Sequence, residues 1–481
     1  MSTARRTQTS NYLGYFALLS IFVVGIWLIV NTGSKLYPGT TQSTDNISVL
    51  APTATTTNTT TETNKFRWLS ARSPLSILLL QIIVIITAAK ICGSIFRRIG
   101  QPPVMGEMVA GIALGPSLLG ALAPNVSSFL FPPSSLGTIG VLSQIGVTLF
   151  MFIVGVDLDL QHLRERASAA IMVSHASIVV PFLLGAALSI ALYPSLSAPN
   201  TAFAPFALFI GTAMSITAFP VLARILKDKD LTQSPLGNIA LACASIDDVT
   251  AWCILAFVIA ISKSGGLNDV ALTIGLTILF IVGMLVLVKP NLERLITKQM
   301  KDGGHSRLVI SEILAFALMC AWITETIGIH ALFGGFLAGV VMPSNAAVQS
   351  FLKNKIEAFS SAILLPLFFV FTGLRTQVTL LNDRNSWIVC LVIIAVAVIG
   401  KLGGSMLMAR WTKMSWRDST AIGVLMNTRG LIELVVLNIG YDLGILSGRI
   451  FVMMVIMALV TTFMTAPLLS LTRLPKANLS V

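Results

Sequence analysis

The chain has 481 residues, of which 55% are hydrophobic and only 11% are charged. This composition excludes an ordinary soluble protein, in which about a quarter of the residues are charged. The formal net charge of +12 comes mostly from short loops between apolar runs. We therefore interpret the basic residues as topology signals and expect no nucleic-acid partner. The five cysteines lie inside apolar runs without metal-ligand spacing, so no disulfide, resident metal or cofactor is expected.

The N-terminal part of the chain differs in composition from the rest. Residues 1–30 contain an apolar run behind Arg5 and Arg6. The run is long for a signal peptide and lacks a clear small-residue cleavage site, which favours an uncleaved anchor helix over a signal-like segment. Residues 31–74 are rich in Thr, Ser and Asn and are predicted to form a disordered linker outside the cytoplasm.

Residues 75–475 contain about thirteen apolar runs that are long enough to cross a bilayer. They begin near residues 75, 102, 136, 168, 203, 235, 269, 308, 329, 360, 386, 418 and 450. The fold class is therefore an all-α polytopic membrane protein. No phosphate-binding glycine loop is evident, so transport by this chain is expected to be secondary or channel-like.

The loops between these runs carry a strong charge asymmetry. Basic residues gather in alternate loops, beginning with the loop at Arg97 and Arg98. By the positive-inside rule those loops are cytoplasmic, and so is the short tail at residues 476–481. The same alternation places Arg5 and Arg6 inside and the Thr-rich linker outside.

Several ionisable residues lie within the apolar runs, where a charge is costly and usually faces a cavity or a partner. They are Glu107, Asp247, Asp248, Glu312, Lys401, Arg429 and Glu433. Glu107 is counted as a further intramembrane acid without an assigned role. Glu312 lies near the end of its run and is explained more simply as a structural group.

The segment ASIDDVTAW, residues 244–252, places Asp247 and Asp248 side by side. On a helix their side chains diverge by about 100°, so one can face an ion pathway while the other meets a neighbouring helix. Lys401, in the segment VIGKLGGS, is the predicted charge partner, and the glycines beside it would allow close helix approach. A carboxylate binds either a proton or a small cation, and that competition couples two fluxes.

Two runs are predicted to be broken helices. They are GTAMSITAFPVLARIL (211–226), where Pro220 is expected to disturb the helix, and AIGVLMNTRGLIELVVLNIG (421–440), which Asn427, Thr428 and Gly430 interrupt. They are the fifth and twelfth of the thirteen runs, so they have opposite orientations. Broken helices in corresponding positions of inverted halves point to a transport site near the membrane midplane.

The residues of these breaks are predicted to line the site. Freed carbonyls and the hydroxyls of Thr217 and Thr428 are expected to help coordinate a cation, with Arg429 and Glu433 beside them.

Five segments together resemble a known family. They are PPVMGEMVAGIALGPSLLG (102–120), TAFPVLARIL (217–226), ASIDDVTAW (244–252), VIGKLGG (398–404) and MNTRGLIELVVLNIG (426–440). The family is the second branch of the monovalent cation/proton antiporters. The resemblance covers roughly residues 75–472 and is strongest to plant cation/H+ exchangers and bacterial Na+(K+)/H+ antiporters.

The resemblance implies an inverted-repeat fold of thirteen core helices, two of them broken and crossed. It further implies an elevator-like cycle and a homodimer in a bilayer, either a bacterial-type cytoplasmic membrane or an internal membrane such as the thylakoid. By motif position, Asp248 matches the family's carboxylate for protons and the transported alkali cation. Asp247 matches the position before it, and Lys401 matches the lysine that pairs with Asp247.

The resemblance leaves the stoichiometry and the choice between Na+ and K+ open. Asp-Asp pairs are associated with electrogenic exchange, whereas plant exchangers often carry Asn-Asp beside the same lysine.

Two other classes of protein share features with this sequence. An intramembrane aspartyl protease needs its two aspartates on different helices, whereas Asp247 and Asp248 are adjacent, so the chain is not expected to be an enzyme. An organic-solute transporter on a similar inverted-repeat fold remains the alternative, with Arg429 as the cationic group. The aspartates favour a cation as the substrate.

Overall fold

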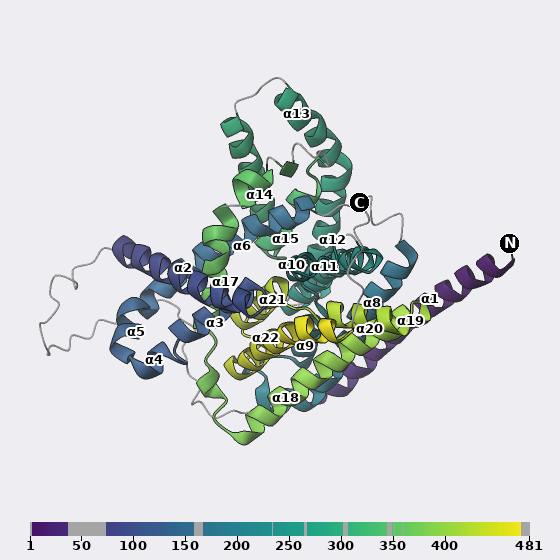
Figure 1. The fold of residues 1–481 in the computed structure, drawn as a ribbon, viewed down its shortest axis with the longest axis horizontal. Coiled ribbons are helices and arrows are strands. Elements are labelled where there is room, and N and C mark those ends of the chain that lie inside the picture. The colour runs from purple at the N-terminus through teal and green to yellow at the C-terminus, as the bar shows by residue number, and fades with distance from the viewer. Residues whose placement is uncertain are drawn as a thin grey trace, which may run out of the picture.

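A computed structural model of the chain describes residues 2–36, 74–157, 167–232, 234–263, 267–301, 306–343, 349–350, 352–357 and 359–472. These residues are almost entirely helical, with one isolated β-bridge between Ser197 and Leu446 (Figure 1). Most of the predicted Thr-rich linker and the tail at 476–481 lie outside the described residues.

The helices used below have the following bounds. They are α1 (Ser2–Gly33), α2 (Pro74–Arg98), α3 (Pro103–Leu114), α4 (Leu119–Leu122), α5 (Pro124–Leu130), α6 (Pro133–Asp157), α8 (Ala167–Leu196), α9 (Phe203–Ser215), α10 (Phe219–Asp228), α11 (Pro235–Lys263), α12 (Leu267–Gly283), α13 (Lys289–Lys301), α14 (Ser306–Ile327), α15 (Ala331–Val340), α17 (Leu365–Leu374), α18 (Arg384–Val398), α19 (Gly404–Trp411), α20 (Trp416–Met426), α21 (Leu431–Asp442) and α22 (Gly448–Leu471). Short π-helical turns join α12 to α13 and α18 to α19.

The predicted polytopic all-α fold is confirmed. Eleven stretches of the described chain are long and apolar enough to cross a membrane, and the bent pair α20–α21 makes a twelfth. The run predicted near residue 329 forms α15, which has only ten residues, fewer than the roughly 20 that a bilayer core requires. The helix ends at Val340, shortly before Pro343, because a proline disfavours helical backbone before it.

The helices form two bundles. In the first, which we call the scaffold bundle, α2, α3, α6, α14, α15 and α17 pack on one another. In the second, the core bundle, α8 and α9 pack together, and α11, α18, α19, α20, α21 and α22 join them. The N-terminal helix α1 packs along α8 and α9, at the right of Figure 1.

An inverted repeat is visible in the scaffold bundle. α2 packs on α3 as α14 packs on α15, and α3 packs on α17 as α15 packs on α6. Counted along the predicted spans, α15 is the seventh span after α3, so the two helices run in opposite directions. Their sequences also match, since MGEMVAG (105–111) of α3 corresponds to FGGFLAG (333–339) of α15.

The first glycine of each matching segment makes the same contact. A Cβ on Gly106 would lie 2.5 Å from the carbonyl oxygen of Cys92 in α2. A Cβ on Gly334 would lie 2.1 Å from the carbonyl oxygen of Cys320 in α14. Both distances are shorter than van der Waals contact, so each helix pair packs backbone to backbone.

The last glycine of each segment does the same at another crossing. A Cβ on Gly111 would lie 2.9 Å from Cα of Gly373 in α17, and a Cβ on Gly339 would lie 2.9 Å from Cα of Gly155 in α6. Four helix crossings are thus built from one glycine pattern used twice.

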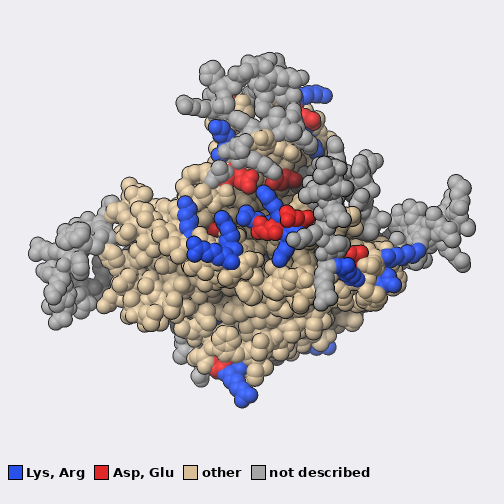
Figure 2. All heavy atoms as spheres, in the orientation of Figure 1, with Lys and Arg blue, Asp and Glu red and all other residues tan. Residues whose placement is uncertain are grey.

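The surface of the molecule fits a membrane environment. Figure 2 shows wide areas without charged side chains, with Lys, Arg, Asp and Glu gathered in a central group and near the edges of this face. Helix α12 and the turn after it expose many large apolar side chains, among them Leu272, Leu279 and Val286. Such apolar exposure is expected where lipid is the solvent.

Gly339→Ala should destabilise the protein. The added methyl group would lie 2.0 Å from the carbonyl oxygen of Phe152, and overpacking of this kind costs about 1–3 kcal/mol. The melting temperature of the purified protein in detergent measures the effect. Gly275→Ala in α12 is the control, because no described atom outside the backbone of its own helix turn lies within 4 Å of a Cβ placed there. Equal melting temperatures for both variants would contradict the close α6–α15 crossing.

Candidate functional site

The two predicted broken helices meet at their breaks. Between α9 and α10 the backbone is extended from Ile216 to Ala218, and between α20 and α21 the chain bends by 41°. The amide of Ala218 donates to the carbonyl oxygen of Thr428 at 3.0 Å. The two broken helices therefore cross in direct contact, as predicted.

The first break lies directly before Pro220, the residue predicted to disturb this helix. Pro220 is the second residue of α10, where an N–H has no partner within the helix, so proline is tolerated there. The break precedes Pro220 and is held by polar contacts of Thr217 and Ala218. Pro220 has no N–H for the carbonyl of Ile216, which a continuous helix would require, and it begins the second half of the broken helix.

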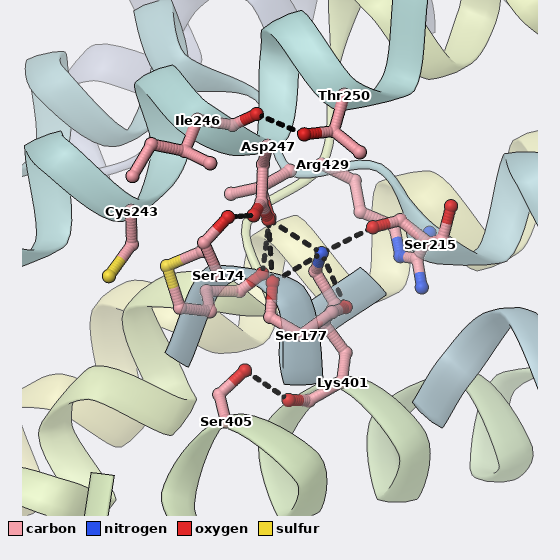
Figure 3. A network of polar contacts seen from close by, with 12 residues as sticks. Ser174, Ser177, Ser215, Cys243, Ile246, Asp247, Thr250, Lys401, Ser405 and Arg429 are labelled. Carbon is pink, nitrogen blue, oxygen red and sulfur yellow. Dashed lines mark hydrogen bonds and ion pairs between the residues drawn. The ribbon is translucent and has the colours of Figure 1, made fainter. Parts of the chain in front are cut away.

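Asp247 is fully buried and accepts four hydrogen bonds (Figure 3). Its Oδ1 accepts from the Ser174 hydroxyl at 2.5 Å. Its Oδ2 accepts from the hydroxyls of Ser177 and Thr217, both at 2.6 Å, and from Lys401 Nζ at 3.1 Å. The donors come from α8, from the break after α9 and from the π-helical turn after α18, so Asp247 ties three elements together.

Lys401 is also fully buried and lies in the π-helical turn Ile399–Gly403. Besides its ion pair with Asp247, its ammonium donates to the carbonyl oxygen of Ser177 at 2.9 Å and to that of Ser215. All its protons can therefore be satisfied within the protein, as a buried ammonium requires.

The glycines around Lys401 allow a close approach of α8. A Cβ on Gly400 would lie 2.9 Å from Cα of Pro181, and a Cβ on Gly404 would lie 2.9 Å from Cβ of Val180. Gly403 does not contribute, because no other described atom lies within 4 Å of a Cβ placed there.

Asp248 has different surroundings from Asp247. It is 2% exposed, and its Oδ1 has no hydrogen-bond partner among the described residues. Its carboxylate lies beside the backbone amide of Phe219, the first residue of α10. A helix N-terminus carries partial positive charge and favours an anion there.

Arg429 joins the two breaks through backbone contacts. Its guanidinium donates to the carbonyl oxygens of Ala213 and Met214 at 2.8 and 2.7 Å, and its Nη1 lies 3.4 Å from Glu433 Oε1. Both charged side chains are fully buried. With Lys401 on Ser215, two cations cap the last three carbonyls of α9, where the helix dipole is negative.

The other predicted lining residues face α22. The Thr428 hydroxyl lies 3.4 Å from that of Thr465, and the Asn427 side chain donates to the carbonyl oxygen of Thr461 at 3.4 Å. The structure therefore places these side chains away from the aspartates. Of the predicted hydroxyls, only that of Thr217 reaches Asp247.

The two remaining intramembrane acids lie apart from this network. Glu107, in α3, is partly buried, and its Oε2 has no hydrogen-bond partner among the described residues. Glu312, in the first turns of α14, is exposed. Within the described chain, no cluster of three or more His, Cys, Asp or Glu side chains offers a resident metal site.

Ser174 and Ser177 are site residues that the sequence interpretation missed. They lie three positions apart in the apolar segment IMVSHASIVV, so they share one face of α8. Two hydroxyls one helical turn apart in an apolar run were the available signal. Serine is common in membrane helices, which makes the signal weak without the position of Asp247.

Residues 83–471 match the family described as "Sodium/hydrogen exchanger, transmembrane". The chain belongs to this family. It is therefore a polytopic transporter and not an enzyme, as expected.

Curated relatives agree with this assignment. "Na(+)/H(+) antiporter NhaS4" of Synechocystis sp. is 44% identical over 82% of this chain and 96% of its own length. "Cation/H(+) antiporter 17" of Arabidopsis thaliana is 40% identical over 82% of this chain. "K(+)/H(+) antiporter 1" of Saccharomyces cerevisiae is 33% identical over 85% of it. This chain spans about half the length of the plant and yeast relatives, 48% and 47%.

A solved structure has a similar fold. The sodium proton antiporter MjNhaP1 from Methanocaldococcus jannaschii superimposes with a TM-score of 0.63 at 14% sequence identity. The match covers 84% of this chain and all of that one. At this identity the similarity concerns the fold.

Arg429→Ala should lower stability, because it leaves Glu433 as a buried, unpaired charge and uncaps α9. Breaking a buried ion pair by removing one partner costs about 3–5 kcal/mol. Melting temperatures of single and double variants measure it. Adding Glu433→Gln should recover part of the loss. Strictly additive losses would show that the two side chains are not coupled.

Proposed function

We propose that this protein is a secondary active antiporter that exchanges a monovalent cation, Na+ or K+, for protons. Cation and proton compete for Asp248, and the Asp247–Lys401 pair tunes the site. The observation that carries this proposal is the difference between two adjacent buried carboxylates. Asp247 accepts from three hydroxyls and an ammonium, whereas Asp248 keeps one oxygen without a donor among the described residues.

The hydrogen bonds support a division of labour. The donors on Asp247 come from residues that also hold the crossing together, so binding a cation there would break the contacts of α8 and Lys401. Asp248 lies beside the amide of Phe219, and its Oδ1, which no described residue contacts by a hydrogen bond, is open to a proton or a cation. Since one carboxylate cannot hold both ligands, each ion carried in one direction requires the other to leave.

The transported cation is either Na+ or K+. The curated relatives are named for sodium, potassium and cations in general. Oxygen ligands suit both Na+ and K+, which are distinguished by cavity size and by the number and field of the ligands. Two carboxylates at the site disfavour an organic anion as the substrate. Arg429, the cationic group that could bind such an anion, is already occupied by Glu433 and two backbone carbonyls.

Alternating access follows from the two bundles. In the proposed elevator-like cycle, the core bundle carries Asp247 and Asp248 past the scaffold bundle and exposes Asp248 to each side in turn. The cytoplasmic side is the one with Arg97 and the C-terminus, as the basic loops indicate. The protein is proposed to be a homodimer in a bacterial-type cytoplasmic membrane or an internal membrane such as the thylakoid.

The N-terminal helix is proposed to remain as an anchor, with residues 31–74 as an extracytoplasmic linker. Packing supports its retention, because Phe22 of α1 lies edge-to-face on Phe182 of α8, with ring centroids 5.2 Å apart.

Asp248→Asn should abolish exchange, because the amide neither binds a proton at neutral pH nor carries the charge that holds a cation. The test uses purified protein in liposomes with an internal pH dye and an imposed proton gradient, to which Na+, K+ or Li+ is added in turn. Glu312→Gln, an exposed intramembrane acid, is the control and should exchange normally. Full activity of Asp248→Asn would remove the basis of the proposal.

Lys401→Met should slow exchange and shift its pH profile, because Asp247 would keep its hydroxyl donors but lose the ammonium. Initial rates over a pH series measure the change. Ser405→Ala is the matched control, since the buried Ser405 hydroxyl donates only to the Lys401 carbonyl, at 2.7 Å. A Lys401→Met profile identical to that of the control would exclude the tuning role.

A further inference from the structure

We propose that Trp252 is a gating residue, which stacks on Phe336 to close the route to Asp248 from the end of α11 that holds Lys263. This inference rests on the proposed function, in which Asp248 must be reached from each side of the membrane in turn.

Trp252 lies directly beyond Asp248 on the same face of α11. The two residues are four positions apart, which is about one turn and about 6 Å along the helix axis. Trp252 is 1% exposed and is the largest fully buried side chain among the described residues. Any ion that reaches Asp248 along this face of α11 from the Lys263 end must pass its indole ring.

The ring packs against the other bundle. Trp252 of the core bundle stacks on Phe336 of α15 in the scaffold bundle, with centroids 6.2 Å apart and planes inclined by 24°. Trp252 Nε1 has no hydrogen-bond partner among the described residues. The contact therefore consists of packing, and movement of the core bundle can separate the rings without breaking a hydrogen bond of the indole.

The inverted repeat supplies an internal comparison. In the matched segments of α3 and α15, Met108 occupies the position of Phe336. Met108 borders a cavity, whose other lining includes Arg429, Ala458 and Thr462, with room for about one water molecule. The equivalent surface of the scaffold is thus filled by an aromatic stack in one half and incompletely packed in the other.

This asymmetry supports the assignment of the closed route to the extracytoplasmic side. In an inverted repeat, equivalent surfaces of the two halves face opposite sides of the membrane. The filled surface lies toward the Lys263 end, which is extracytoplasmic in the proposed orientation. The cavity lies beside the first turns of α3, which follow the cytoplasmic Arg97 loop.

Polar contacts at the same end also join the bundles. Arg375, at the end of α17, donates to Asn438 Oδ1 at 3.0 Å and forms an ion pair with Asp442 of α21. Its guanidinium lies 4.7 Å from the centroid of the Tyr441 ring. At the opposite face, a longer hydrogen bond of 3.3 Å joins Gln101 to the carbonyl oxygen of Phe463. The scaffold and core bundles are thus held together beyond Trp252.

The test measures access to the site from each side. Asp248→Cys is placed in a protein whose five native cysteines are replaced by alanine. A membrane-impermeant, cationic thiosulfonate is applied to right-side-out or inverted vesicles, and the labelling rate is followed by mass spectrometry. The rate is compared with native Trp252, with Trp252→Ala and with Trp252→Phe.

Trp252→Ala should raise the labelling rate from the extracytoplasmic side roughly tenfold or more. With the indole ring present, the route is open only in a minor state of about 10% or less, and without the ring it is open all the time. Trp252→Phe keeps an aromatic ring on Phe336 and should stay close to the parent rate. Phe336→Ala removes the stack from the other bundle and should reproduce the increase. No increase with either alanine variant, or an increase from the cytoplasmic side alone, would overturn the gate.

A second reporter guards against misfolding. Ala251→Cys keeps both carboxylates and should give the same order of rates if the Asp248→Cys protein is unstable. Melting temperatures of the variants separate gate opening from unfolding. Labelling does not depend on ion exchange, so the two proposals can fail separately. If Asp248→Asn exchanges ions normally, the proposed function fails, but the order of labelling rates among the Trp252 variants is unaffected. If Asp248→Asn is inactive but the Trp252→Ala and Phe336→Ala substitutions leave the labelling rate unchanged, only the gate fails.

Discussion

The structure depends on how charge is balanced where two broken helices cross. Lipid offers no hydrogen bonds, so each backbone group and charge freed by the breaks must find its partner within the protein. Lys401 and Arg429 cap the last three carbonyls of α9, and Asp247 and Glu433 balance those cations. The crossing is therefore a closed electrostatic unit, and α8, α11, α21 and the turn after α18 are held in register by it.

The balance of this unit makes the two adjacent aspartates unequal. Asp247 is used fully in holding the crossing, while Asp248 diverges on the helix and lies at the N-terminus of α10. A chain that needs both a fixed anion and an exchangeable one can place them next to each other, because the helical rotation separates their surroundings. The same rotation puts Trp252 one turn beyond Asp248, where the core bundle meets the scaffold bundle.

The scaffold bundle is built by a different means. Its helices approach through glycines, and matching glycines of α3 and α15 make matching contacts at four crossings. Backbone-to-backbone packing depends on small residues at set intervals, which many sequences can provide. This explains how the fold resembles that of MjNhaP1 at only 14% identity. It also leaves positions such as Met108 and Phe336 free to differ and to make the two access routes unequal.

The sequence by itself determined the apolar spans, the two breaks, the paired aspartates and the lysine, because hydrocarbon tolerates few polar residues and each exception is conspicuous. It did not determine which hydroxyls meet Asp247: Ser174 and Ser177 were missed, and Thr428 faces α22. It also overestimated the length of α15. Contacts of this kind depend on the rotation and depth of neighbouring helices. Residues that are distant in the chain together determine this rotation and depth, so only the tertiary structure decided which side chains meet.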